Sequence, residues 1–197
     1  MVRLSGAYDR LALARHECAH AACASACGMR VQCVRLRPEP YTHVRYRIDR
    51  AQLPQCWRVS STETARRVIE AIGVILAPSI LDPDGSPWRA GSDDAQLLRC
   101  WQLAWNRLRI GSGRTTIAPW DSLERQARVA VDRWGTSADA WLALTWLAEA
   151  LMQAGALSGR QWTALWQQKP VRALWSPEQA TVSQTTPLQK RGARSRE

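Results

Sequence analysis

The chain has 197 residues, 46% of them hydrophobic, and a formal net charge of +10. Its length suits one domain with a core of its own rather than two independent domains. The sequence has no run of about 18 apolar residues, and its N-terminus lacks the charged start and apolar stretch of a signal peptide. We therefore expect a cytoplasmic protein with no membrane span.

The positive charge raises the alternative of a nucleic-acid-binding protein, because clustered basic side chains neutralise phosphates. Part of that charge lies in the polar segment 169–197, which has six basic and two acidic residues and which we expect to be disordered. The remaining charge is spread along the predicted helices. We therefore place the folded domain at 1–168 and do not expect nucleic acid as its partner, although a basic helical nucleic-acid-binding protein stays an alternative.

The first predicted element is a helix from Tyr8 to about Ala26, where alanine, leucine and cysteine recur with helical periodicity until Gly28 ends it. Alternating polar and apolar residues then predict a β-hairpin with strands over Met29–Arg37 and Thr42–Ile48. The six cysteines of the chain include no C-x-x-C pair, so we expect free thiols.

The rest of the domain is predicted to be helical. An apolar helix from about Glu63 to Ala77 is expected to end at Pro78. Glycines and capping residues divide the following residues into four further helices, over 93–108, 120–134, 137–154 and 158–167. The predicted fold class is therefore mainly α (α+β), with one small β-hairpin.

The first helix contains the pattern H-E-x-x-H, as His16-Glu17-Cys18-Ala19-His20. Two residues four apart on a helix lie about 40° apart and one turn along the axis, so both imidazoles can meet one zinc ion. A glutamate next to the first histidine can take a proton from water held at the metal. The pattern therefore predicts His16 and His20 as zinc ligands and Glu17 as the general base.

Two other interpretations of this helix stay open in the residues themselves. His16, His20, Cys23 and Cys27 fall on one stripe, so the histidines could line a packing face of small residues. A structural zinc site could also combine His20 with Cys23 or Cys27, although one helix cannot surround an ion with four ligands.

The sequence around the pattern resembles the peptidase domain of the FtsH family of ATP-dependent zinc metalloproteases. In that family the helix reads H-E-A-G-H-A, closes at a glycine at the same distance and leads into a strand. Here Cys18 and Ala19 replace Ala-Gly, while the two histidines and the glutamate are kept. The stretch Ala71–Pro78 takes the place of a glycine-rich helix of the family, but the paired glutamates that end that helix are missing.

The resemblance also implies a third ligand. Ala90-Gly91-Ser92-Asp93-Asp94 looks like the family's G-A-S-N-D segment, whose aspartate binds zinc, and the match puts Asp94 at the ligand position. Asp93 is the alternative if the register differs by one residue. Acidic residues also favour the first turn of a helix for electrostatic reasons alone, so this pair has a structural interpretation as well.

The resemblance implies a helical zincin-like peptidase that binds Zn²⁺ and hydrolyses peptide bonds. The family's membrane helices have no counterpart here, since no apolar run is long enough, and the G-x-x-x-x-G-K-[ST] motif of its ATPase module does not occur. Such a domain would cleave polypeptides that are already unfolded, depend on a separate ATPase or unfoldase, or persist as a catalytically silent zinc-bound interaction domain. The sequence leaves these alternatives open, together with a homo-oligomer.

Overall fold

The computed structural model describes residues 6–36, 61–82, 93–111 and 117–168, and these residues are mainly helical. The described part contains six helices and one two-stranded antiparallel sheet. The helices are α1 (Gly6–Ala26), α2 (Ser61–Leu81), α3 (Asp93–Gly111), α4 (Trp120–Gly135), α5 (Ala138–Ala154) and α6 (Gly159–Gln168). The strands are β1 (Cys33–Arg35) and β2 (Ala156–Ser158). The mainly α prediction is confirmed at this level.

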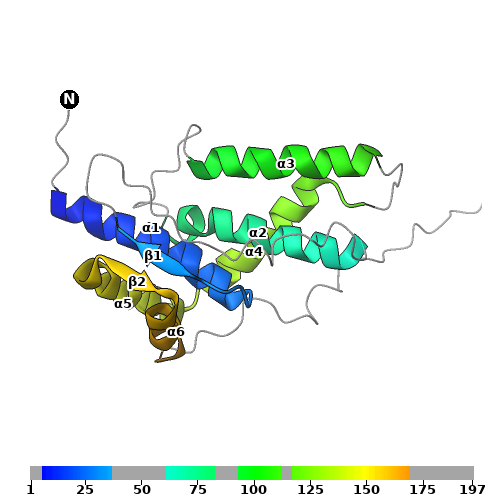
Figure 1. Cartoon of the computed structure of the whole chain (residues 1–197). Coiled ribbons are helices and arrows are strands. Elements are labelled where there is room, and N and C mark those ends of the chain that lie inside the picture. Colours follow the sequence, from blue (N-terminus) through cyan, green and yellow to red (C-terminus); the bar gives the residue numbers. More distant parts are fainter. Residues whose placement is uncertain (1–5, 37–60, 83–92, 112–116, 169–197) are drawn as a thin grey trace, which may run out of the picture.

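Helix α1 lies in the centre of the fold, against α2 on one side and α5 on the other (Figure 1). It ends as the sequence predicts, because Gly28 has a positive φ of 72° and the Met29 amide donates to the carbonyl of Ala24 at 2.8 Å. Small side chains allow its close contact with α2. A Cβ at Gly73 of α2 would lie 3.9 Å from the sulfur of Cys23 and 3.4 Å from Val131 of α4.

Helix α2 continues one turn beyond its predicted end. The sequence places the end at Pro78, whereas the structure places this buried proline inside the helix, which extends to Leu81. Proline cannot donate a backbone hydrogen bond to the carbonyl four residues earlier, which belongs to Val74. It can still accept one, and the amide of Asp82 donates to the Pro78 carbonyl at 3.0 Å. The proline thus removes one helical hydrogen bond without ending the helix.

The sheet differs from the predicted hairpin in its described pairing. Strand β1 runs antiparallel to β2, with Val34 opposite Leu157, and both of these side chains are buried. The predicted strand Thr42–Ile48 lies outside the described residues. Strand β2 is absent from the prediction because it has only three residues between two helices, which is too short for an alternating pattern. One edge of β1 is therefore occupied by the chain's own β2.

Two hydrophobic clusters hold the helices together. The larger contains the small residues of α1 with α5, the sheet and Trp162 of α6. The smaller joins α2 and α4 and includes Trp105 of α3. Figure 1 shows α3 on the far side of α2 from α5 and α6. Within the described residues, no helix is both long and apolar enough to cross a membrane. The predicted basic tail, 169–197, lies outside the described residues.

Candidate metal centre

The two histidines of α1 lie on one face of the helix and point toward each other. Their Nε2 atoms are 3.2 Å apart, and the rings meet edge to face with centroids 4.8 Å apart. His20 is fully buried with 1% of its surface exposed, whereas the side chain of His16 is 16% exposed. Helical spacing alone accounts for the convergence, because residues four apart are neighbours on the helix surface.

Asp94, in the first turn of α3, completes the cluster from a different part of the chain. Its Oδ2 lies 3.2 Å from Nε2 of His16 and 3.3 Å from Nε2 of His20. Among the described residues, these three form the one group of three or more histidine, cysteine or acidic side chains that could hold a metal ion. The side chain of Asp93, the alternative in the sequence, lies outside the described ones. The structure therefore brings together the three side chains that the sequence nominates as ligands.

The donor atoms have the spacing that a tetrahedral metal ion requires. A zinc ion with ligand bonds of about 2.0–2.2 Å keeps its ligand atoms about 3.3–3.6 Å apart. The three observed separations, 3.2, 3.2 and 3.3 Å, lie within a few tenths of an ångström of that value. Two imidazole nitrogens and one carboxylate oxygen are also a donor set that zinc accepts in catalytic sites, where a fourth position stays open. The residues present fit the ion.

Glu17 lies beside the cluster but outside the triangle. Its Oε1 is 3.9 Å from Nε2 of His16, and its side chain is 7% exposed. Its Oε2 is buried and has no hydrogen-bond partner among the described residues. A buried carboxylate oxygen without a partner is costly, and such atoms in folded proteins call for a functional explanation. Glu17 thus has one oxygen available for a molecule that enters the site.

The pKa values of the two carboxyl groups of the site, Glu17 and Asp94, are shifted in opposite directions. Burial raises the pKa of Glu17 to about 8, while the charge of His20 opposes this and that of Asp94 adds to it. Burial also tends to raise the pKa of Asp94, but its contacts with the imidazoles of His16 and His20, and their charges, outweigh burial and hold this pKa below its ordinary value. Among the described residues, no lysine or arginine forms an ion pair with either carboxylate. No described lysine or arginine therefore neutralises either carboxylate.

The pKa values of the two imidazoles, His16 and His20, are also shifted in opposite directions. Burial lowers the pKa of His16, and its interactions with Asp94 do not fully offset this. Burial acts on His20 in the same direction, but Asp94, Glu17 and the Val74 carbonyl together raise its pKa above the ordinary value. Asp82, just after α2, is buried, and its charge tends to raise the pKa of His16. Asp82 has no motif in the sequence that would mark it as a neighbour of the site.

His20, the more buried of the two histidines, has a further hydrogen-bond partner on α2. Its Nδ1–H donates to the carbonyl of Val74 at 2.7 Å, across 54 residues of sequence. Metal-binding histidines commonly donate their second ring nitrogen to such an acceptor, which fixes the ring orientation and the tautomer. Val74 could not be recognised from the sequence, because a backbone acceptor has no signature in its own side chain.

The cysteines of α1 do not join this group. Cys23 is 1% exposed and packs where α1 approaches Gly73, and Cys27 lies against the larger hydrophobic cluster. Neither belongs to the group of candidate ligands found among the described residues. Residues 21–26 of α1 thus form a packing segment, and residues 16–20 before them form a polar segment.

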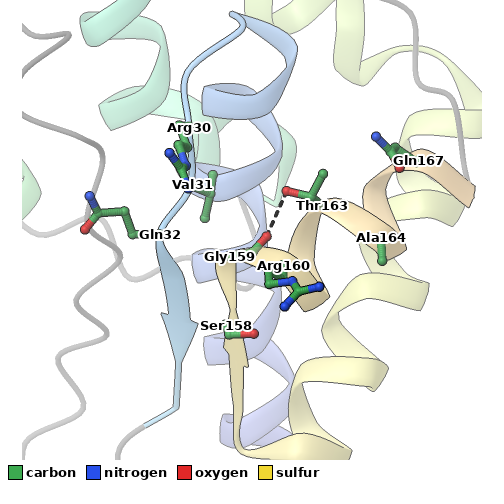
Figure 2. Close-up of a pocket in the computed structure, with 9 residues that line it drawn as sticks. All are labelled: Arg30, Val31, Gln32, Ser158, Gly159, Arg160, Thr163, Ala164 and Gln167. Atoms are coloured by element: carbon green, nitrogen blue, oxygen red, sulfur yellow. Dashed lines mark hydrogen bonds between the residues drawn. The ribbon is translucent and has the colours of Figure 1, made fainter.

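A pocket of about 680 Å³ lies elsewhere, between the residues leading into β1 and helix α6 (Figure 2). Its lining includes the basic side chains of Arg30 and Arg160, and Thr163 donates to the carbonyl of Gly159 at its edge. Its described lining residues include no histidine, cysteine, aspartate or glutamate. These residues therefore offer neither metal ligands nor a general base, and the candidate for chemistry in the described part of the chain is the cluster on α1.

A scan against models of known protein families finds no match for this chain, and a search of curated proteins finds none either.

Proposed function

We propose that this chain is a zinc-dependent metallopeptidase-like domain that hydrolyses peptide bonds in unfolded polypeptides without an ATPase of its own. The observation that carries the proposal is the triangle formed by Nε2 of His16, Nε2 of His20 and Oδ2 of Asp94, with the carboxylate of Glu17 beside it. The resemblance of the zinc helix to the FtsH family supports the same assignment, with a zincin-like fold.

In this proposal His16, His20 and Asp94 hold the ion. When bound, zinc supplies a Lewis acid that polarises a peptide carbonyl and lowers the pKa of water. The positive charge of the ion also favours the ionised form of Glu17, whose pKa burial raises to about 8. The polar cluster is then consistent with its buried surroundings.

Glu17 acts in the proposal as the general base and then as the general acid. Its free oxygen, Oε2, accepts a proton from the attacking water. The same carboxyl group then donates that proton to the nitrogen of the leaving amine as the peptide bond breaks. One carboxyl group can serve in both steps, because the first step protonates it and the second returns it to the carboxylate.

Polypeptides that are already unfolded are the proposed substrates, because unfolding a stable protein requires work from an ATPase and these 197 residues contain no nucleotide-binding P-loop motif. A separate unfoldase is a candidate partner for folded substrates.

The test compares the full-length wild-type chain with Glu17→Gln. We expect each to bind one zinc ion, measured by elemental analysis, and the variant to cleave an unfolded protein about 10²–10⁴ times more slowly, since it lacks the general base. Glu149→Gln, the same change at an exposed site on α5, is the matched control and should cleave like the wild type. Equal cleavage by wild type and Glu17→Gln, or a wild type without stoichiometric zinc, would overturn the proposal.

The same measurements separate the catalytically silent alternative. In that case the wild type would hold one zinc ion and still leave an unfolded substrate intact. Glu17 would then have no chemical task, and its burial would stay unexplained.

A further inference from the structure

Pro78 stands at an unusual position for proline, buried in the interior of α2. A proline has no N–H to donate, and its ring pushes against the carbonyl four residues earlier. The helix therefore leaves the Val74 carbonyl without its usual donor. Removing a hydrogen bond inside a helix is destabilising, so the acceptor needs another partner if it is to stay buried at low cost.

That partner is His20. Its Nδ1–H donates to the Val74 carbonyl at 2.7 Å, a short bond between two buried groups on different helices. The two observations are complementary, because the carbonyl that lacks a helical donor is the one that the imidazole reaches. Val74 itself is 1% exposed, so water is a poor substitute for either donor.

The bond has a consequence for the other side of the ring. A neutral imidazole has one N–H donor and one nitrogen lone pair, so a proton held on Nδ1 leaves the lone pair on Nε2. Nε2 is the atom that faces His16 and Asp94, at 3.2 and 3.3 Å. A ring with the opposite tautomer would point an N–H at the position where a metal ion needs a lone pair.

We infer that Pro78 is a positioning residue, which reserves the Val74 carbonyl for His20 and thereby holds Nε2 of His20 as a lone-pair donor in the candidate metal centre. The part of this inference that concerns metal rests on the proposed function, whereas the effect on the His20 ring can be measured without metal. A proline that served only to shape α2 would have no influence on the tautomer.

The experiment uses the full-length, metal-free chain and the substitution Pro78→Ala, which restores an N–H directed at Val74. The ring nitrogens of His20 are observed by ¹⁵N NMR at a pH where the ring is neutral, and assigned by their loss in His20→Gln. We expect the Nδ1–H tautomer alone in the wild type and a mixture of both tautomers in Pro78→Ala. Pro78→Val, which adds the same N–H with another side chain, should give the same mixture.

Ser79→Ala is the matched control, because it changes the same turn of α2 by removing the hydroxyl that donates to Leu76, without adding a donor near Val74. It should keep the wild-type tautomer. As a second readout, titration with zinc should show an affinity about 10–100 times lower for Pro78→Ala than for the control, the usual effect of losing an outer partner of a metal ligand.

The outcomes separate this inference from the proposed function. An unchanged tautomer in Pro78→Ala, or the same mixture in Ser79→Ala, would overturn the role of Pro78 whatever the zinc titration shows. A wild type that binds no zinc would overturn the proposed function, while a tautomer that depends on Pro78 would still support its control of the His20 ring.

Discussion

Two consecutive segments of α1 bury different chemistry: a polar segment, residues 16–20, and a packing segment, residues 21–26. The polar segment buries His20 and Glu17, and one oxygen of Glu17 has no described partner. The packing segment buries small side chains such as Ala22 and Cys23 against neighbouring elements. The packing segment follows the usual rules of stable packing, whereas the buried polar groups of the other segment depart from them, and such departures concentrate at functional sites.

The largest effect should come from changing Asp94, the candidate ligand that α3 adds to the polar segment of α1. Asp94→Asn keeps the shape of the side chain but removes its charge, and we expect the zinc affinity to fall more than about 100-fold, beyond the usual loss from an outer partner. Asp121→Asn is the matched control, because Asp121 is an exposed acidic residue in the first turn of α4. It should leave the zinc affinity unchanged. Equal effects of the two substitutions would reduce Asp94 to compensation of the helix dipole.

Among the contacts around the packing segment, the largest expected effect is a loss of folding stability when a side chain is added at Gly159. A Cβ added at Gly159 would lie 2.6 Å from the carbonyl oxygen of Val31 and 2.9 Å from that of Gln32, both backbone atoms that cannot move independently. We expect Gly159→Ala to lower the free energy of unfolding by about 1–3 kcal/mol, as overpacking does. Denaturant unfolding measures this. An exposed neighbour, Ala156→Ser, should change it by less than about 0.5 kcal/mol.

The comparison also shows how far the sequence predicts the molecule. Helical periodicity locates all six described helices, and the spacing of His16 and His20 on one helix is enough to bring their imidazoles together. Asp94 is different, because a first-turn aspartate has an ordinary electrostatic role, and only the resemblance to a family nominates it as a ligand. Its approach to α1 depends on how α3 packs, which local periodicity does not contain.

The misses have related causes. Strand β2 is defined by its pairing with β1 and has too few residues for a pattern of its own. The continuation of α2 through Pro78 reverses a strong local preference, since tertiary contacts outweigh the lost helical bond. The hydrogen bond from His20 to Val74 joins residues 54 positions apart through a backbone atom. In each case the deciding interaction lies between elements and not within one.

The stability of the metal-free protein should depend on pH through Glu17, which lies in the polar segment of α1. The pKa of Glu17 is about 8 in the folded state, above its ordinary value of 4.5. The folded state therefore binds this proton more tightly than the unfolded chain, and its contribution to stability is lost as the pH rises from about 4.5 to 8.

Glu17→Gln cannot lose a proton, so it provides the reference. Between pH 4.5 and 8 the unfolding free energy of the wild type should fall relative to the variant by more than about 1.4 kcal/mol, which corresponds to one pKa unit. Chemical denaturation at several pH values in the presence of a chelator measures the difference. A constant difference across this range would contradict the burial of Glu17 in the metal-free state.

The smallest expected effect concerns the hydrogen bond that joins the packing segment of α1 to α6. The indole N–H of Trp162 donates to the hydroxyl of Ser25 at 2.8 Å, and that hydroxyl donates to the carbonyl of Ala21 at 2.8 Å. Ser25→Ala would leave the N–H of a side chain that is 1% exposed without this acceptor, at a cost of about 1 kcal/mol in unfolding free energy. In a Trp162→Phe background the same substitution should cost less, because no indole N–H is left unpaired. Equal costs in both backgrounds would assign the loss to Ser25 alone. An unchanged zinc affinity in Ser25→Ala would show that the packing segment can be weakened without altering the polar segment.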